Sequence, residues 1–271
     1  MKQLSLLVLV LAMAVSVAGA QDIESMMAGR AQIGAGQLSE AWLQNPAFLG
    51  LGAWNDGADS FWNHSIVAAV EIDGDTDLRA LSWGGNPAGK PYGVGAGMVD
   101  VEGMDAFGAG IGWGSSTGRI AAGLNFQSID TGNSDDLSVL DFAVSGRASS
   151  ALGLDGAIWG IVVRDITDEM TTTLDLGLGF EAAQWKFALD LEDVSDEVDT
   201  ILQVGASRFF GREDNWQAGV GLDDGDLTAG LVYHASTSDA KLDWKIGLAY
   251  IDGGDGEDDA LVLGGGTTWG P

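Results

Sequence analysis

Two histidines, His64 and His234, are the only imidazole groups in the chain, and there is no cysteine. An imidazole that titrates near neutral pH can act as a general base or bind a metal ion. No serine, asparagine or acid stands at a spacing that would mark a catalytic partner. Two histidines so far apart in sequence do not predict a metal site either. The sequence therefore does not predict an enzyme.

Oxygen-rich segments offer a second kind of chemistry, the binding of Ca²⁺. Residues 73–77 read Asp-Gly-Asp-Thr-Asp and begin like a calcium loop, but the later glycine and glutamate of such a loop are missing. Residues 253–258 fit a single copy of a calcium-binding β-roll repeat without neighbouring copies. No cofactor is expected, and adventitious Ca²⁺ at these acidic loops is the most that the pattern predicts.

Charged residues also fall inside the apolar, alternating part of the chain. We expect four cations to point into the interior of a closed sheet opposite four carboxylates: Arg147, Lys186, Arg208 and Lys245 against Asp141, Asp175, Asp190 and Asp243. A ladder of this kind either fills and stiffens a barrel or lines a selective channel. The sequence leaves both interpretations open.

Composition shows that charged and apolar residues must be kept apart. The chain has 40 Asp and Glu against 12 Lys and Arg, a formal net charge of −28, yet 46% of its residues are hydrophobic. So few cations argue against a nucleic-acid partner, because phosphates are bound by Lys and Arg. A chain that is both acidic and apolar needs two separate surfaces.

The separation has a period of two, which is the signature of β-strands. In residues 173–181, four large apolar side chains lie on one face, and Thr, Asp, Gly and Glu lie on the other. We predict fourteen strands at residues 61–72, 77–85, 92–100, 105–114, 118–129, 137–147, 152–164, 169–181, 183–192, 198–209, 214–223, 227–236, 240–251 and 260–269. The short links between them predict an all-β, antiparallel up-and-down arrangement.

An even number of strands with one apolar face is typical of a transmembrane β-barrel of the bacterial outer membrane. A soluble sandwich or propeller is the alternative fold, because its strands alternate too. The charges favour the barrel. Most carboxylates fall in the turns that join strands 1–2, 3–4 and so on, which share one end of the sheet, here named the acidic rim. The opposite turns carry Lys90, Arg119, Arg147, Arg212 and Lys241.

Tryptophans gather at the end opposite the acidic rim, here named the aromatic rim. Seven of the ten fall there: Trp62, Trp83, Trp113, Trp185, Trp216, Trp244 and Trp269. Tryptophan concentrates at membrane–water interfaces, so we predict an aromatic girdle, which a sandwich core gives no reason for. An even strand count puts both chain ends on the periplasmic side. We therefore expect the outer membrane of a Gram-negative-type bacterium, with the acidic rim outward.

The N-terminus reads as a secretory signal, with Lys2, an apolar stretch and the small residues Ala18-Gly19-Ala20. We divide the chain into a signal peptide at 1–20, an N-terminal plug at 21–60 and a barrel at 61–271. The plug does not alternate, and it contains Asn45-Pro46-Ala47-Phe48. Pro46 disfavours a helical conformation at Asn45 and ends any helix there, which predicts a rigid turn.

The segment Gly-Arg-Ala at 29–31, Gly-Ala-Gly at 34–36 and Asn-Pro-Ala at 45–47 resembles the start of FadL-type hydrophobic-compound transporters and the related PorV/PorQ outer-membrane proteins. The resemblance implies a fourteen-stranded barrel whose lumen holds residues 21–60 as a hatch, with Asn45, Pro46, Ala47 and Phe48 as hatch and lumen residues. It implies passive transport of small hydrophobic compounds through a porin-like barrel. The alternative is a scaffold that docks secretion-system proteins and conducts nothing.

Glycines on the inward face of two strands would let the hatch backbone come close to the barrel wall. They are Gly93, Gly95, Gly97, Gly108, Gly110 and Gly112. Short, acidic outer loops are a poor landing site for fatty-acid carboxylates. If the barrel transports anything, the expected ligand is a hydrophobic compound without that charge.

Overall fold

The structure is a computed structural model of the whole chain, in which the described residues form two short helices and a β-sheet. It describes residues 41–52, 63–74, 78–87, 90–101, 104–115, 118–130, 136–148, 157–182, 184–195, 200–211, 215–237, 242–253 and 259–269. The predicted signal peptide, the rest of the predicted plug and Trp62 lie outside these residues. So do most of the residues of the two calcium-like segments.

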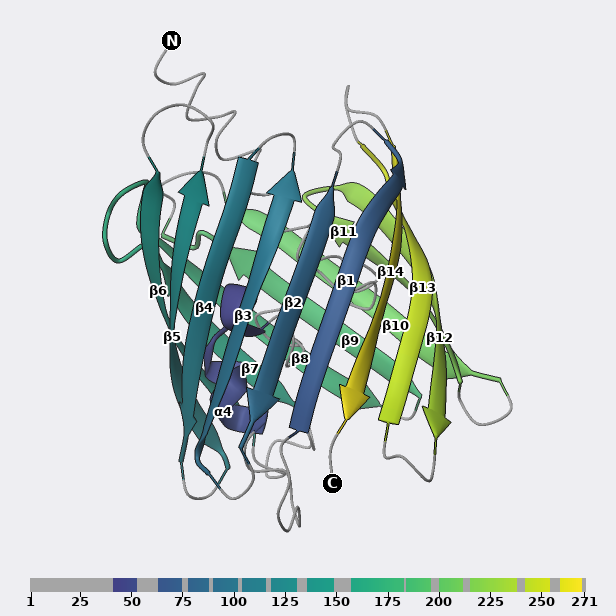
Figure 1. Cartoon of the computed structure of the whole chain (residues 1–271), viewed down its shortest axis with the longest axis horizontal. Coiled ribbons are helices and arrows are strands. Elements are labelled where there is room, and N and C mark those ends of the chain that lie inside the picture. Colours follow the sequence, from purple (N-terminus) through teal and green to yellow (C-terminus); the bar gives the residue numbers. More distant parts are fainter. Residues whose placement is uncertain are drawn as a thin grey trace.

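Fourteen antiparallel strands close into one barrel, each strand pairing with its neighbours in sequence and β1 pairing with β14 (Figure 1). The strands are β1 (Asn63–Asp73), β2 (Arg79–Asn86), β3 (Tyr92–Val101), β4 (Met104–Gly114), β5 (Ile120–Asp130), β6 (Leu137–Arg147), β7 (Ile158–Arg164), β8 (Thr173–Ala182), β9 (Trp185–Glu192), β10 (Ile201–Phe210), β11 (Trp216–Asp223), β12 (Asp226–Thr237), β13 (Leu242–Ile251) and β14 (Ala260–Trp269). The predicted fold class and strand number are confirmed.

Turn chemistry explains why neighbouring strands pair so directly. Asp224 and Gly225 join β11 to β12, and both have positive φ angles, 50° and 102°. Two consecutive residues of this kind form the tight hairpin turn whose twist matches that of the flanking strands. The register is regular from Asp223 opposite Asp226 to Trp216 opposite Tyr233. Every second side chain on these strands therefore faces the same way.

The outer face of the barrel is apolar, and its side chains are unusually exposed for their type. Phe107 is 61% exposed, Trp113 58% and Val220 55%. A soluble protein rarely leaves a continuous apolar surface open to water, whereas the outer wall of a membrane barrel meets lipid. The apolar stripes do not meet each other inside a two-layer sheet, which excludes the sandwich. Within the described residues, no helix is both long and apolar enough to cross a membrane.

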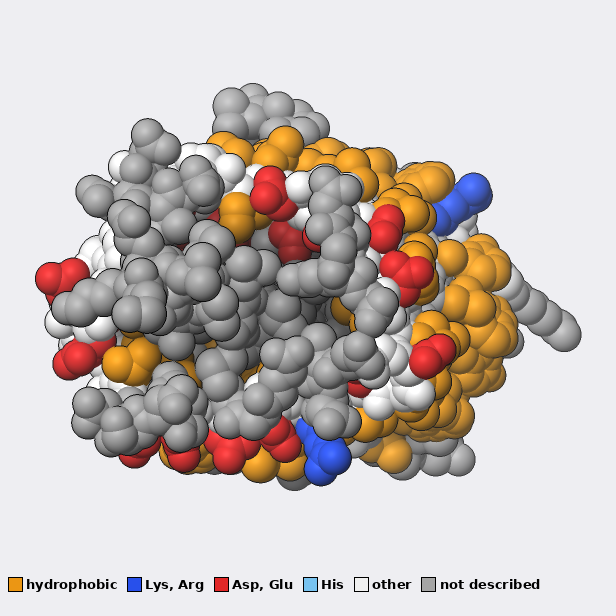
Figure 2. Space-filling model, turned by 90° about the horizontal axis from the view of Figure 1, so that it is seen from above, with side chains coloured by type: hydrophobic (Ala, Val, Ile, Leu, Met, Phe, Trp, Pro, Cys, Tyr) orange, Lys and Arg blue, Asp and Glu red, His pale blue; other side chains and the backbone are white. Residues whose placement is uncertain are grey.

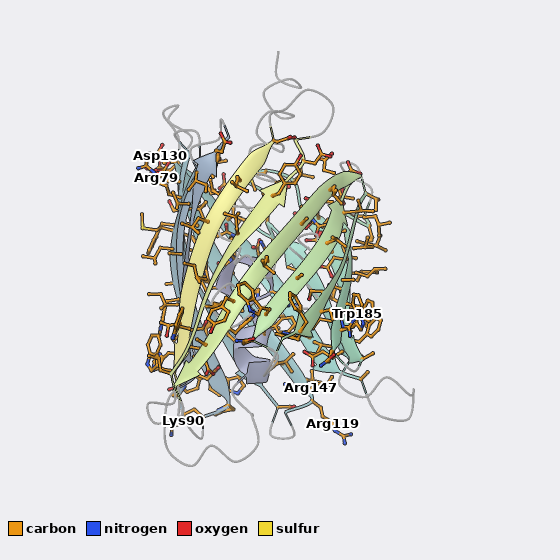
Figure 3. The ribbon with its side chains drawn as sticks, turned by 90° about the vertical axis from the view of Figure 1, so that its right-hand side faces the viewer. Arg79, Lys90, Arg119, Asp130, Arg147 and Trp185 are labelled. Atoms are coloured by element: carbon orange, nitrogen blue, oxygen red, sulfur yellow. The ribbon has the colours of Figure 1, made fainter. Side chains whose placement is uncertain are left out.

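The two ends of the barrel differ in charge. Figure 2 looks onto the acidic rim, where Asp and Glu side chains surround the end of the barrel and apolar side chains cover the outer wall. In Figure 3, Asp130 and Arg79 lie at this end, while Lys90, Arg119 and Arg147 lie at the other.

Candidate functional site

Two short helices lie inside the barrel, α3 (Ala41–Gln44) and α4 (Ala47–Gly52) (Figure 1). They pack mainly against β2 to β6, so they occupy one side of the lumen. Ala41, Trp42, Ala47 and Leu49 are fully buried. A segment this short has no core of its own, and the barrel wall must supply its packing. We call residues 41–52 the docked hatch segment.

Asn45 makes several hydrogen bonds in the turn between the two helices. The side-chain Oδ1 of Asn45 accepts a hydrogen bond from the amide of Ala47 at 3.2 Å, and its carbonyl accepts one from the amide of Phe48 at 3.0 Å. The Nδ2 of Asn45 donates to Oγ of Ser145 on β6 at 2.8 Å. Asn45, Ala47 and Phe48 are all buried, as is Ser145. The turn is therefore held both internally and against the wall.

Glycines make this close approach geometrically feasible. A Cβ atom placed on Gly112 would lie 2.3 Å from the carbonyl oxygen of Pro46, and one on Gly123 would lie 2.3 Å from its carbonyl carbon. A Cβ on Gly108 would lie 2.4 Å from the ring of Trp42. Such distances are too short for real atoms, so only glycine fits at these positions. The predicted close approach is confirmed, and Gly123 takes part in it as well. We call the inward glycines that contact the docked hatch segment, among them Gly108, Gly112 and Gly123, the glycine wall.

Neutral hydrogen bonds fix the docked hatch segment at two more points. The indole Nε1 of Trp42 donates to Oγ of Ser82 on β2 at 3.1 Å. The side-chain amide of Asn86, also on β2, donates to the carbonyl of Leu49. Buried polar groups cost free energy unless they are paired, so these contacts favour a single docked position.

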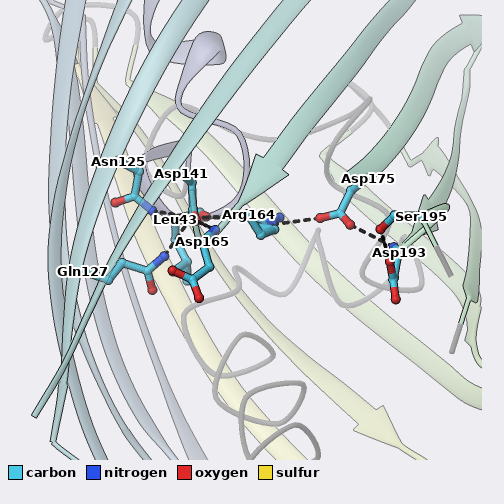
Figure 4. Close-up of polar contacts among 9 residues, drawn as sticks. All are labelled: Leu43, Asn125, Gln127, Asp141, Arg164, Asp165, Asp175, Asp193 and Ser195. Atoms are coloured by element: carbon cyan, nitrogen blue, oxygen red, sulfur yellow. Dashed lines mark hydrogen bonds and ion pairs between the residues drawn. The ribbon is translucent and has the colours of Figure 1, made fainter. Parts of the chain in front are cut away.

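A buried ion pair network lies beside the hatch segment and includes Arg164 at the end of β7 (Figure 4). Nε of Arg164 donates to Oδ2 of Asp175 at 2.8 Å, and its Nη1 lies 3.6 Å from Oδ2 of Asp141. Nη1 also donates to the carbonyl of Leu43, the third residue of α3, at 2.9 Å. Arg164 therefore joins two strands of the wall to the hatch segment.

The two carboxylates of this network also hold turns at the acidic rim. Oδ1 of Asp141 accepts from the amide of Asp165, and Oδ1 of Asp175 accepts from the amide of Asp193, each at 2.9 Å. Asp165 and Asp193 have positive φ angles of 48° and 49°, and each begins a turn of similar sequence, Asp-Ile-Thr-Asp-Glu or Asp-Val-Ser-Asp-Glu. The network thus extends from the hatch segment to two outer turns.

The predicted charge ladder is correct for some of its members and wrong for others. Asp141, Asp175 and Asp190 are buried as expected, but the described cation beside Asp141 and Asp175 is Arg164, which is not one of the four expected cations. Arg208 faces outward beside Trp185, because its position on β10 is one residue out of phase with the buried Ser207. Lys186 shares the inward face of β9 with the buried Ala188 and Asp190, but its described ion pair is with the exposed Glu181, at 3.9 Å.

Arg147 and Asp243 are both exposed rather than buried in the lumen: Figure 3 shows Arg147 near the aromatic rim, and Asp243 is the second residue of β13. Lys245 does share the inward face of β13 with the buried Ala249. His234 is also inward, and its Nε2 lies 3.1 Å from Oε1 of Gln217. Within the described part of the chain, no three His, Cys, Asp or Glu side chains group closely enough to hold a metal ion.

The wall opposite the hatch segment is lined by small apolar residues. This apolar wall is formed by β12, β13, β14 and β1, and its buried residues include Val67, Ala69, Val232, Ala249 and Val262. The charged network belongs to β6, β7 and β8 instead. The ion pair network and most of the small apolar side chains therefore lie on different strands, although Lys245, His234 and Thr228 also face inward from β12 and β13.

The six described tryptophans of the predicted girdle are Trp83, Trp113, Trp185, Trp216, Trp244 and Trp269. They lie near strand ends on the side of the aromatic rim, and Figure 3 shows Trp185 there. His64 stacks between the rings of Trp83 and Trp269, at centroid distances of 5.9 and 5.0 Å. This contact accounts for His64 without a catalytic role.

Comparison with known proteins bears on the fold. The TodX deltaS2S3 mutant, a monoaromatic hydrocarbon channel, matches 90% of this chain and 98% of its own, with 10% identity and a TM-score of 0.51. The toluene transporter TbuX of Ralstonia pickettii matches 89% of this chain and 96% of its own, with 10% identity and a TM-score of 0.51. The chain shares their barrel fold. No protein-family model and no curated protein matches the sequence.

The FadL-type resemblance seen in the sequence is thus confirmed at the level of the fold. The barrel is of the outer-membrane type. The two similar proteins are described as a monoaromatic hydrocarbon channel and a toluene transporter.

Proposed function

We propose that the barrel passes small hydrophobic compounds passively across the outer membrane and that residues 21–60 act as a hatch. The observation that supports this most is the division of the lumen. The docked hatch segment lies on β2 to β6, while the facing wall of β12 to β1 presents Val67, Val232 and Val262. An apolar wall lowers the cost of removing an apolar solute from water without offering it a strong binding site.

The docked position is the closed state in this proposal, and release from the glycine wall opens the passage. The acidic rim faces outward, so neutral compounds enter more readily than carboxylates, which its charge repels. The aromatic girdle then lies at the periplasmic interface. The printed descriptions of the two similar proteins, a monoaromatic hydrocarbon channel and a toluene transporter, agree with this substrate class.

A reversible cross-link tests the gate. Asn45 and Ser145 are replaced together by cysteine, because their side chains meet at 2.8 Å and the chain has no other cysteine. Uptake of a labelled aromatic hydrocarbon into proteoliposomes is measured with the pair oxidised and then reduced. We expect uptake to fall by about tenfold on oxidation, a change of about 1.4 kcal/mol in the passage barrier, and to recover on reduction.

The Asn45→Cys single variant is the matched control, because it carries the same change in the hatch without a partner for a disulfide. Equal uptake by the oxidised and reduced pair contradicts a gating hatch. Absence of uptake in both states, with the barrel intact by its heat-dependent mobility on a gel, favours the second candidate.

That second candidate is a scaffold that docks partner proteins, and the Arg164 network is the observation that favours it. The network ties the hatch segment to the turns beginning at Asp165 and Asp193. A plug fixed from the lumen to the outer surface suits a rigid platform. Secretion-system proteins are then the proposed partners.

A further inference from the structure

An arginine on the lipid-facing surface of a barrel requires an explanation. Arg208 is exposed on the outer face of β10, two residues before that strand ends at Phe210 near the aromatic rim. Among the described strand residues that face outward, Arg79 is the other Lys or Arg, and it lies at the acidic rim. A charge on the lipid face is costly in the hydrocarbon layer and tolerated near the interface.

The surroundings of Arg208 are aromatic rather than acidic. Its guanidinium carbon lies 5.6 Å from the ring centroid of Trp185, the residue directly opposite on β9. No described carboxylate forms an ion pair with it. A guanidinium on an aromatic face keeps its planar donors free for a phosphate, which it can bind in a bidentate manner.

An apolar groove rises from the same corner of the barrel into the lipid-facing belt. It has a volume of about 520 Å³, within the roughly 300–1,000 Å³ range of small-molecule sites. Trp216 and Tyr233 line its lower end, Leu231, Leu248 and Leu263 line its middle, and Ala229 is the alanine among the lining residues. Figure 3 looks onto this side of the barrel.

The strand register connects the arginine to the groove. Arg208 pairs with Ala218, which pairs with Leu231, which pairs with Leu248. Leu231 is six residues from the end of β12 at Thr237, whereas Arg208 is two from the end of β10. The groove therefore extends farther from the aromatic rim than the arginine does. This is the arrangement of a lipid, with its head group at the interface and a chain in the hydrocarbon layer.

We propose that this corner binds one glycerophospholipid, with its phosphate on Arg208 and one acyl chain in the groove. The phosphate supplies the anion that the guanidinium lacks within the described protein. The chain covers the apolar side chains of β11 to β14. The proposal depends on the membrane-facing exterior and not on transport. The lipid site and the proposed transport function can therefore fail separately.

Native mass spectrometry of the intact protein in mild detergent tests this site. Phosphatidylglycerol or diacylglycerol is added as the probe, and the fraction of protein carrying one lipid is measured. We expect retention of phosphatidylglycerol but not of diacylglycerol, which has the chains without the phosphate. The variant Arg208→Gln should weaken retention about tenfold, and Arg208→Lys should weaken it less, because charge is kept while bidentate geometry is lost.

Matched variants separate a site from general effects. Arg119→Gln removes an exposed arginine at the same rim and should leave retention unchanged. Ala229→Phe fills the groove and should lower retention, while Ala109→Phe, on the outer face of β4, should not. Equal retention by the parent and Arg208→Gln overturns the proposal, as does equal binding of diacylglycerol. Displacement of the phospholipid by lipid A at equal concentration also overturns it.

Discussion

Replacing Arg164 with methionine is expected to lower the free energy of unfolding by about 3–5 kcal/mol, because it leaves two buried carboxylates without their cation. Asp141 is fully buried and Asp175 is 3% exposed. The larger share of the loss should come from Asp175, whose hydrogen bond to Arg164 is 2.8 Å long. Asp141 keeps hydrogen bonds from Asn125 and Gln127 at 3.1 and 3.0 Å. Urea titration of the barrel in detergent or lipid measures the change.

Two control variants make the Arg164 result interpretable. Arg147→Met removes an exposed arginine of the neighbouring strand β6 and should change stability by less than about 0.5 kcal/mol. Adding Asp141→Asn and Asp175→Asn to Arg164→Met removes the unpaired charges and should restore most of the lost stability. If the Arg164→Met variant has the same free energy of unfolding as the Arg147→Met variant, the ion pairs of Arg164 do not stabilise the barrel.

Converting Gly112 and Gly123 to alanine is expected to undock the hatch segment. Each added Cβ would lie 2.3 Å from a backbone atom of Pro46, which cannot rotate away as a side chain can. Overfilling of this kind costs about 1–3 kcal/mol at each site. A strand has little freedom to move within a closed barrel, so the hatch segment should yield first.

A single reporter cysteine measures that undocking. Leu51→Cys places a thiol at a position that is 2% exposed, in a chain without other cysteines. A water-soluble maleimide should label it at least about tenfold faster in the double alanine variant, since labelling follows the fraction of undocked molecules. Gly265→Ala is the control, because its Cβ would face outward and lie 3.0 Å from its nearest neighbour, the carbonyl oxygen of Lys245. Unchanged labelling in the double variant contradicts the glycine wall.

Much of the barrel could be predicted because side-chain alternation is a local property of the sequence. The spacing of two between Leu174, Leu176 and Leu178 is enough to predict that these side chains lie on the same face of a strand. Gly108 and Gly112 could be assigned to the inward face in the same way, and the close approach of the hatch follows from their missing side chains. Alternation also gives the strand number, because each tight turn interrupts it.

Pairing across strands could not be read in the same way. The expected partner of Asp175 was one of four other cations, yet Arg164 fills that place from the end of β7. Arg164 is the last residue of the predicted strand 152–164, and nothing in the alternation marks it as the partner of a carboxylate on another strand. Which side chains of neighbouring strands meet depends on the register between the strands, and this register is set by the stagger that closes the barrel. No local sequence pattern specifies that stagger. Arg208 was misassigned because its strand was read one residue out of phase.

The most direct test of the account is the accessibility of spin labels along β13 in lipid bilayers. Single cysteines at Ile246, Leu248 and Tyr250 should carry labels that collide mainly with oxygen dissolved in the hydrocarbon layer. Labels at Gly247 and Ala249 should not, because these residues face the lumen. We predict alternation with a period of two. High accessibility to a water-soluble quencher at Ile246, Leu248 and Tyr250 would contradict a lipid-facing barrel, and the proposals on the hatch and the phospholipid would fall with it.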